Sequence, residues 1–296
     1  MFFDPPREIP ARLLTRLPDH LRRLERTEWA DANRGGALVD SFLEGPAFDA
    51  QGRLYVTDIP NGRIFRIEDD HWTEIAAYAG WPNGLKVQPD GDLLVADYRH
   101  GLIRIAPETG AAAAMLQTVN TESFKGLNDL TLHDDESVIF TDQGQTGLQD
   151  PSGRVWRLHK DGRIDRLLAN GPSPNGLVLN TTQTHLYVAM TRSCEVWRFA
   201  LRPDAIVAKA QCFARVPPGV SGPDGLAMDA HDRLYIANPG HGCVWVIDPH
   251  GKPLYRVQSY HGRMTTNCAL TPDGRNLVIT ESETGSILIA EIPPYV

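Results

Sequence analysis

The sequence predicts an all-β protein: a six-bladed β-propeller with four-stranded blades around a central channel. A pattern of short strands recurs six times, with starting residues 39 to 49 positions apart, and such a period is typical of propellers. Apolar residues alternate within the segments, as in LYV at 54–56 and VIF at 138–140, which indicates strands. An open sandwich of several sheets is the alternative, but it would give no reason for a regular period.

Each copy of the pattern starts at a small polar corner and contains three strand segments. The first two strands are separated by a turn rich in Gly and Asp, and a loop leads to the third. Sequences such as PDG, DAQG and DPHG favour hairpins at these turns. In chain order the copies occupy residues 44–69, 83–110, 128–145 with 153–168, 175–201, 224–252 and 267–292.

The repeats also predict the domain organisation. Residues 37–296 are expected to form the single propeller domain, and residues 1–36 an N-terminal extension packed on it. A closed propeller needs its two ends to share a blade, because otherwise one sheet edge stays unpaired. We expect residues 37–43 to complete the last blade. The segment 11–29 could form one or two helical turns, interrupted by Pro18.

Composition restricts the class of partner. The formal charge is -8, with 29 Lys and Arg against 37 Asp and Glu, and no basic cluster suits a nucleic acid or an anionic membrane. The first residues lack the pattern of a secretory signal and no apolar run is long enough to span a membrane, so a cytoplasmic monomer or small homo-oligomer is expected. The cysteines, Cys194, Cys212, Cys243 and Cys268, form no CxxC pair; reduced thiols are expected, with a bridge as the alternative.

The corners of the six copies are expected to meet around one mouth of the channel. Asn and Asp favour turns by bonding their own backbone, so a single Asn-Gly corner can be only a turn. A role in turns does not explain Glu44, because glutamate is not a typical turn residue. It also does not explain why two carboxylates would meet in the channel, where they would repel each other without a cation. Carboxylate and amide oxygens suit Ca²⁺, Mg²⁺ or Mn²⁺. The six corners are Glu44, Asn83, Asn128, Asn175, Asp224 and Asn267.

Several motifs at these corners resemble those of the senescence marker protein / gluconolactonase / luciferin-regenerating enzyme-like family. They are EGP at Glu44, LND before the strand VIFTD, PNGL at Asn175, PDGL at Asp224, and TTNCALTPDG in the last copy. The resemblance covers nearly all of the chain after residue 40. It implies one divalent metal ion in the channel, with Ca²⁺ expected and Mg²⁺, Mn²⁺, Zn²⁺ or Fe²⁺ as alternatives. The ligands that it implies are Glu44, Asn128, Asn175 and Asp224.

The resemblance also implies a reaction. Similar enzymes hydrolyse sugar lactones, drug-like lactones or phosphofluoridates. The hypothesis is lactone hydrolysis in which the metal stabilises charge on the carbonyl oxygen and Asp224 acts as base or nucleophile. Asp129 could hold Asn128 in place or cap a turn. Animal relatives carry Arg where this chain has Gly126, with Lys125 beside it, and this departure leaves the substrate open.

Loops between the second and third strands of each copy are expected to form the wall of the pocket. Arginine there would suit hydroxyl groups or a carboxylate of a substrate, and histidine could move protons. A solvated side chain is the simpler explanation for each loop residue, and a loop hydrogen bond is the alternative for Asp142, which ends a second strand. The candidate substrate-binding residues are Asn83, Tyr98, Arg99, Asp142, Arg192 and His241.

Three rival functions remain open from the sequence. A metal-free propeller of the strictosidine synthase type would not need Glu44 and Asp224 together. A non-enzymatic binding propeller is a second rival, because the fold alone does not set function. The third is an organophosphate or ester hydrolase that uses the same metal, since one Lewis acid can polarise either a carbonyl or a phosphoryl oxygen.

Overall fold

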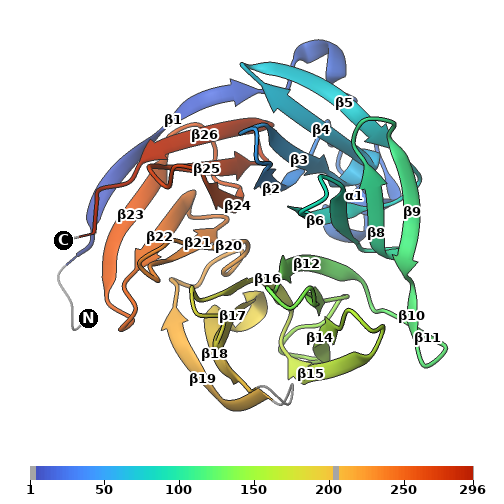
Figure 1. Cartoon of the computed structure of the whole chain (residues 1–296). Coiled ribbons are helices and arrows are strands. Elements are labelled where there is room, and N and C mark those ends of the chain that lie inside the picture. The colour runs from blue at the N-terminus through green and yellow to red at the C-terminus, as the bar shows by residue number, and fades with distance from the viewer. Residues whose placement is uncertain (1–4, 203–206, 296) are drawn as a thin grey trace.

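The computed structural model describes residues 5–202 and 207–295, which form six blades arranged around a central axis (Figure 1). Each blade is antiparallel, and its first strand lies nearest to the axis. This is the six-bladed propeller that the repeats predicted. Within the described ranges, no helix is long and apolar enough to cross a membrane, and all four cysteines are unpaired.

The strands follow the repeats in chain order. Blades one to three comprise β2 Leu43–Phe48, β3 Leu54–Asp58, β4 Arg63–Glu68 and β5 His71–Ala77; β6 Pro82–Val87, β7 Leu93–Asp97, β8 Gly101–Ala106 and β9 Ala111–Leu116; and β12 Leu127–Leu132, β13 Val138–Asp142, β14 Gly153–Leu158 and β15 Ile164–Gly171. Blades four and five comprise β16 Pro174–Leu179, β17 His185–Met190, β18 Glu195–Leu201 and β19 Val207–Arg215; and β20 Leu226–Met228, β21 Leu234–Asn238, β22 Cys243–Ile247 and β23 Pro253–Ser259.

Blade six takes its outer strand from the N-terminal end of the chain. It contains β24 Thr265–Leu270, β25 Asn276–Glu281, β26 Ser286–Glu291 and β1 Arg7–Arg16. The second half of β1 pairs antiparallel with β26, while its first half pairs parallel with β23 of blade five. The expectation that residues 37–43 close the last blade is therefore wrong, because β1 occupies the free edge of β26.

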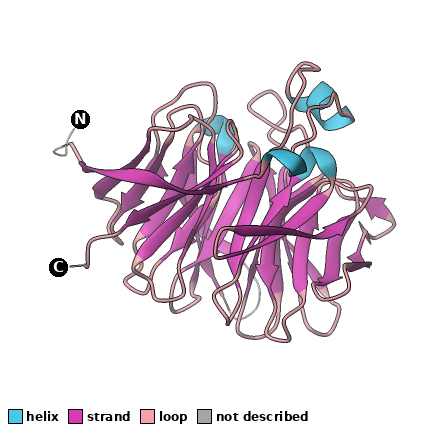
Figure 2. Cartoon of the chain, turned by 90° about the horizontal axis from the view of Figure 1, so that it is seen from above, coloured by secondary structure: helices cyan, strands magenta, loops and turns pink. Residues whose placement is uncertain are grey.

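The remaining elements are short. They are the hairpin of β10 Thr118–Val119 and β11 Glu122–Ser123, the 3-10 turns η1 Asp19–Leu21, η2 Ile59–Asn61 and η3 Thr191–Ser193, and the helix α1 Glu28–Asn33. The segment 11–29, which was expected to form helical turns, contains the second half of β1, the turn η1 and the first residues of α1. Figure 2 shows that the helical elements gather on one face of the propeller.

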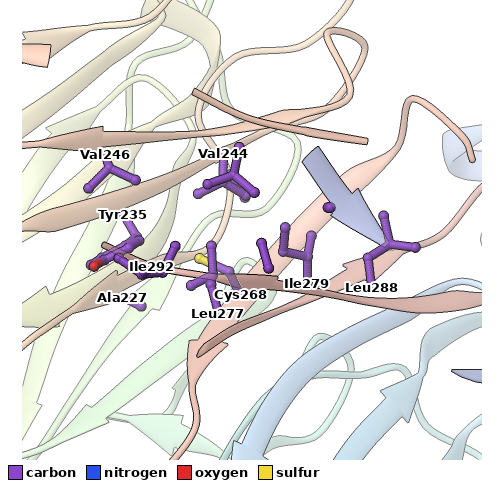
Figure 3. Close-up of a cluster of buried hydrophobic side chains, with 13 residues drawn as sticks. Ala227, Tyr235, Val244, Val246, Cys268, Leu277, Ile279, Leu288 and Ile292 are labelled. Carbon is purple, nitrogen blue, oxygen red and sulfur yellow. The ribbon is translucent and has the colours of Figure 1, made fainter. Parts of the chain in front are cut away.

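Each pair of neighbouring blades encloses its own hydrophobic cluster. Between blades five and six, Tyr235, Val244, Cys268 and Leu288 point into one such cluster (Figure 3). Both faces of every sheet are covered in this way, which explains the buried runs LYVTD, LLVAD and VIFTD in the second strands. The apolar packing that stabilises the protein is therefore distributed around the ring.

Buried threonine hydroxyls connect one blade to the next close to the axis. A threonine of one blade donates to a backbone carbonyl in or beside the first strand of its neighbour, at 2.8 to 2.9 Å. Such bonds set the height of the first strands relative to one another. The pairs are Thr57 with Asn83, Thr141 with Asn175, Thr191 with Pro223, and Thr266 with Leu43, the last of which closes the ring.

We expect Leu17→Ala to destabilise the protein by about 2–5 kcal/mol, since Leu17 is fully buried between blades six and one and its truncation leaves a cavity. Leu13→Ala is the matched control in β1, because the Leu13 side chain is 38% exposed and its loss should cost less than about 1 kcal/mol. Urea unfolding midpoints measure both. Equal destabilisation by the two changes would contradict this role of Leu17.

Candidate functional site

Corner residues of five blades line one cavity at the central channel. The first strands that carry or follow these residues surround the axis in Figure 1. Glu44, Asn83, Asn128 and Asn175 each hold the second position of a first strand, and Asp224 lies two residues before β20. All five line one cavity of about 300 Å³. Ligand pockets start at about this volume, so the cavity suits a single small molecule.

Blade six departs from this arrangement. The strand pairing makes Thr266, not Asn267, the equivalent of Glu44, and neither of these two blade-six residues lines the cavity. Asn267 lies one residue further along the strand, where its Nδ2 donates to Glu44 Oε2 at 2.9 Å. The expectation that Asn267 is the sixth corner is wrong, because the blade-six corner sequence TTN is shifted by one position relative to the other blades.

Glu44 is a buried carboxylate with few compensating partners. Its Oε2 accepts hydrogen bonds from the backbone N–H of Gly45 at 3.0 Å and from Asn267 Nδ2. Burial raises the pKa of Glu44 to about 7, and the charge of Asp129 adds to this, while the two hydrogen bonds oppose it. No cationic side chain is among the main influences on Glu44.

Asp224 is the second carboxylate of the cavity. Its backbone N–H donates to the carbonyl of Ala237 at 2.9 Å, which fixes the chain just before β20. Burial raises the pKa of the Asp224 carboxyl well above its ordinary value, and repulsion from Glu44 raises it further. A hydrogen bond from Asn175 and the positive charge of Arg192 oppose this shift.

One of the two carboxamides, that of Asn128, is oriented by a chain of hydrogen bonds. Asn128 Nδ2 donates to Gln143 Oε1 at 2.9 Å, and Gln143 Nε2 donates to Ser173 Oγ at 3.0 Å. Asn175 lies close enough to Asp224 to lower the pKa of that carboxyl. Because the nitrogen of Asn128 is engaged, its amide oxygen is the atom left to bind a cation.

A layer of polar side chains lies one residue further along the first strands. Asp129 and Asn267 occupy this layer, and glycines stand at the equivalent positions of other blades. A Cβ on Gly84 would lie 2.1 Å from Asp129 Oδ1, and one on Gly225 would lie 2.0 Å from Asn267 Oδ1. Burial raises the pKa of Asp129, and the charge of Lys86 is the largest opposing influence. Asp129 Oδ1 also accepts the N–H of the next residue at 2.8 Å.

The donor set fits a divalent cation that prefers oxygen. Among residues 5–202 and 207–295, no three or more His, Cys, Asp or Glu side chains form a group that could hold a metal ion. The candidate set therefore consists of two carboxylates, from Glu44 and Asp224, and two amides, from Asn128 and Asn175. Burial chiefly raises the pKa of both carboxyls, and repulsion from neighbouring carboxylates adds to it; a cation would oppose both effects. Oxygen donors of this kind are those that Ca²⁺ takes.

Two of the predicted wall residues line the same cavity. Tyr98 does so from the loop after β7, where its hydroxyl accepts a hydrogen bond from Gln145 Nε2 at 3.2 Å. Arg192 does so from η3 in blade four. Together with Asn83, they are the predicted substrate-binding residues that the structure brings to the cavity.

Arg99 and His241 lie outside this cavity. Arg99 pairs with Glu28, and its guanidinium carbon lies 4.1 Å from the centre of the Trp81 ring. This places it at a neighbouring hollow of the surface. The Nε2 atom of His241 lies 3.2 Å from the carbonyl oxygen of Pro218. Both side chains stand on the loops that the sequence indicated, but they turn toward other partners.

Asp142 is fully buried behind the cavity wall. Its Oδ1 accepts the backbone N–H of Lys125 at 2.7 Å and that of Gly126 at 2.9 Å, and its Oδ2 pairs with Arg154. These contacts hold the turn that leads into β12 and so position Asn128. They leave Asp142 out of contact with the cavity.

The sequence reasoning missed the part of the wall that precedes the first blade. Trp29, Asn33, Arg34 and Phe42 all line the cavity. They come from α1 and the chain after it, and the repeat pattern gives no register there. A weak signal was available at Thr27, whose side chain accepts the N–H of residue 30 at 3.2 Å as the N-cap of α1.

Comparison with known proteins identifies the family. Residues 42–283 match the family described as SMP-30/Gluconolactonase/LRE-like region, and the chain belongs to this family. It is similar to a gluconolactonase of Zymomonas mobilis, with 29% identity over 68% of this chain and 60% of that protein. It is also similar to a lactonase drp35 of Staphylococcus epidermidis, with 27% identity over 83% of this chain and 82% of that protein.

Solved structures agree on the fold. A gluconolactonase of Xanthomonas campestris superposes with a TM-score of 0.76 at 22% identity, over 98% of both chains. A structure from Agrobacterium tumefaciens, described as the calcium-binding protein regucalcin, gives a TM-score of 0.75 at 21% identity, over 97% of this chain and 95% of that one. At this identity the likeness concerns the architecture.

The raised carboxyl pKa values predict a pH dependence. Without metal, the pKa of Glu44 rises from 4.5 in the unfolded chain to about 7 in the folded protein. The unfolded chain loses the Glu44 proton at lower pH than the folded protein does. The free energy of unfolding therefore falls as the pH rises from about 4.5 to 7, by an amount on the order of a few kcal/mol. We expect Glu44→Gln to flatten this fall in chelator-treated protein, as measured by urea unfolding at pH 5, 6, 7 and 8. An unchanged pH profile in the variant would contradict the shift.

The hydrogen-bond chain to Asn128 predicts a second effect. Gln143→Leu removes the group that engages Asn128 Nδ2, and loss of such an outer partner typically lowers metal affinity 10- to 100-fold. Calorimetric titration of chelator-treated protein with Ca²⁺ measures this. The control is Gln149→Leu, because Gln149 is exposed in the same loop region and its amide donates to the Gln145 carbonyl, not to Asn128. Equal affinities in wild type and the Gln143 variant would refute the orienting role.

Proposed function

We propose that the chain is a metal-dependent lactonase that hydrolyses a sugar-acid lactone or a related small lactone. The observation that carries the proposal is the meeting of Glu44, Asn128, Asn175 and Asp224 in one small cavity at the propeller mouth. The named relatives, a gluconolactonase and lactonases, support the same reaction.

The proposed cofactor is one divalent ion held by Glu44, Asn128, Asn175 and Asp224. Ca²⁺ is our first choice because every donor is a hard oxygen, and the relative described as calcium-binding supports it. When bound, the ion supplies Lewis acidity toward the lactone carbonyl oxygen. The two amides contribute no charge, so two carboxylates balance one divalent ion.

The residues of the chain then have separate tasks. Asp224 accepts a proton from the attacking water, since it is a carboxylate held next to the site of reaction. The water oxygen bonds to the carbonyl carbon, the ring C–O bond breaks, and the departing oxygen receives the proton to give a hydroxy acid. Glu44 holds the cation and is itself fixed by Asn267, while Tyr98 and Asn83 line the space beside the lactone.

We expect Asp224→Asn to lower kcat for lactone hydrolysis at least about 100-fold, which is the lower range for loss of a general base. Glu44→Gln should chiefly lower metal content, because it removes one of two neutralising charges. Elemental analysis of purified protein and hydrolysis of D-glucono-1,5-lactone, with and without chelator, measure both effects. Asp273→Asn serves as control, since Asp273 lies exposed in the turn between β24 and β25.

The outcomes separate the rival functions. Turnover that disappears on chelation and returns with a divalent ion supports the proposal. Phosphotriester hydrolysis without lactone hydrolysis would move the proposal to an organophosphate hydrolase. Absence of bound metal together with no turnover of any lactone under any divalent supplement would refute the enzyme and leave a binding propeller.

A further inference from the structure

Two arginine side chains line the cavity and have no acidic partner there. They are Arg34, just after α1, and Arg192, in η3. Within residues 5–202 and 207–295, neither guanidinium forms an ion pair within 4 Å. Both residues are exposed at the rim of the cavity, in contrast to the buried Arg63 and Arg233, which are paired with Asp58 and Asp229. Two unneutralised cations at a pocket mouth indicate a ligand that carries negative charge.

Arg34 stands on a fixed platform. Its guanidinium carbon lies 4.9 Å from the centre of the Phe42 ring and 6.0 Å from that of Trp29, and those two rings lie 4.7 Å apart. Trp29 in turn packs with Ile59 of blade one. The charges of Glu283 and Asp224 act on Arg34 from beyond ion-pair distance. Arg34 is thus positioned at the cavity by aromatic packing, without an ion pair to a described protein carboxylate.

Arg192 approaches from the other side of the channel. It belongs to the loop between β17 and β18 of blade four, which lies across the axis from α1 (Figure 1). The preceding Thr191 is buried and bonded to the carbonyl of Pro223 at 2.8 Å, so the loop is anchored beside Asp224. The positive charge of Arg192 acts on the Asp224 carboxylate.

The charge balance of the cavity favours an acidic substrate. Glu44 and Asp224 supply two negative charges, which one divalent ion would neutralise. Arg34 and Arg192 then leave an excess of positive charge in the lining. A neutral sugar lactone would offer these arginines only hydroxyl groups, whereas a carboxylate would form the stronger charge-assisted hydrogen bonds.

We propose that the substrate is a monosaccharide-sized lactone that carries a free carboxylate, as in the lactone of a sugar diacid, and that Arg34 and Arg192 bind this carboxylate. The inference rests on the proposed lactonase function and names its substrate class. Both arginines line the same cavity as the four oxygen donors, so a lactone ring at those donors would place its carboxylate end among the remaining lining residues. Arg34 and Arg192 are then specificity-determining residues.

The test compares two lactones that differ at one end. D-glucaro-1,4-lactone carries the carboxylate, and D-glucono-1,4-lactone replaces it with a hydroxymethyl group. We expect kcat/KM to be about tenfold or more higher for the acidic lactone, as one charge-assisted contact provides. Arg34→Gln and Arg192→Gln should each reduce that preference through KM, and the preference of the wild type should shrink as salt is raised. D-glucono-1,5-lactone is assayed alongside as a general lactonase substrate.

Arg263→Gln is the matched control. Arg263 is exposed and precedes β24 on the same face, but it does not line the cavity. Thermal unfolding and metal content of every variant show whether each one folds and binds its ion. The control should keep both the activity and the preference of the wild type.

Each outcome decides one of the two proposals. Equal or better hydrolysis of the neutral lactones, or arginine variants that slow both 1,4-lactones equally, would overturn the acidic substrate and leave the lactonase intact. Hydrolysis of none of the three lactones under any divalent supplement would overturn the lactonase, and the acidic substrate with it. A preference for the acidic lactone that both arginine variants lose would establish the recognition.

Discussion

Repulsion between buried carboxylates at the propeller axis is the constraint on which the site depends. Glu44 and Asp224 come from blades one and five, and both carboxyls have raised pKa values because they share a place with little solvent. Asp129 adds a third acidic group one layer away. Such an arrangement is costly for folding alone, and this cost is the physical reason for the proposal of a bound cation.

The propeller holds these groups together through its own repetition. Threonine hydroxyls link neighbouring blades near the axis and place the corner residues at one height. Glycines such as Gly84 and Gly225 leave room in the next layer, which the side chains of Asp129 and Asn267 fill. Blade six brings no corner residue to the cavity, and Asn267 of its next layer instead holds Glu44. The candidate ligands thus come from equivalent corner positions of different blades, and the groups that support them come from the next position along the strands.

The N-terminal segment has two tasks that a repeat cannot perform. Its strand β1 pairs with both β23 and β26, and so joins blades five and six. The chain then crosses to the cavity face, where α1 packs by Trp29 against Ile59 and brings Arg34 to the mouth. Closure of the ring and the composition of the cavity wall are therefore connected by about thirty residues of chain.

The sequence by itself determined the six blades, because each blade must repeat the same alternation and turns to bury its two faces. It also determined most of the candidate site, since Glu44, Asn83, Asn128, Asn175 and Asp224 recur at one point of the repeat. Only the tertiary structure decided the closing strand, the shifted corner in blade six, and the direction of side chains such as Arg99, Asp142 and His241. It also brought Arg34 to the cavity. These features depend on contacts between segments far apart in the chain. No local periodicity sets the register there, so long-range packing determines which segments pair and where each side chain points.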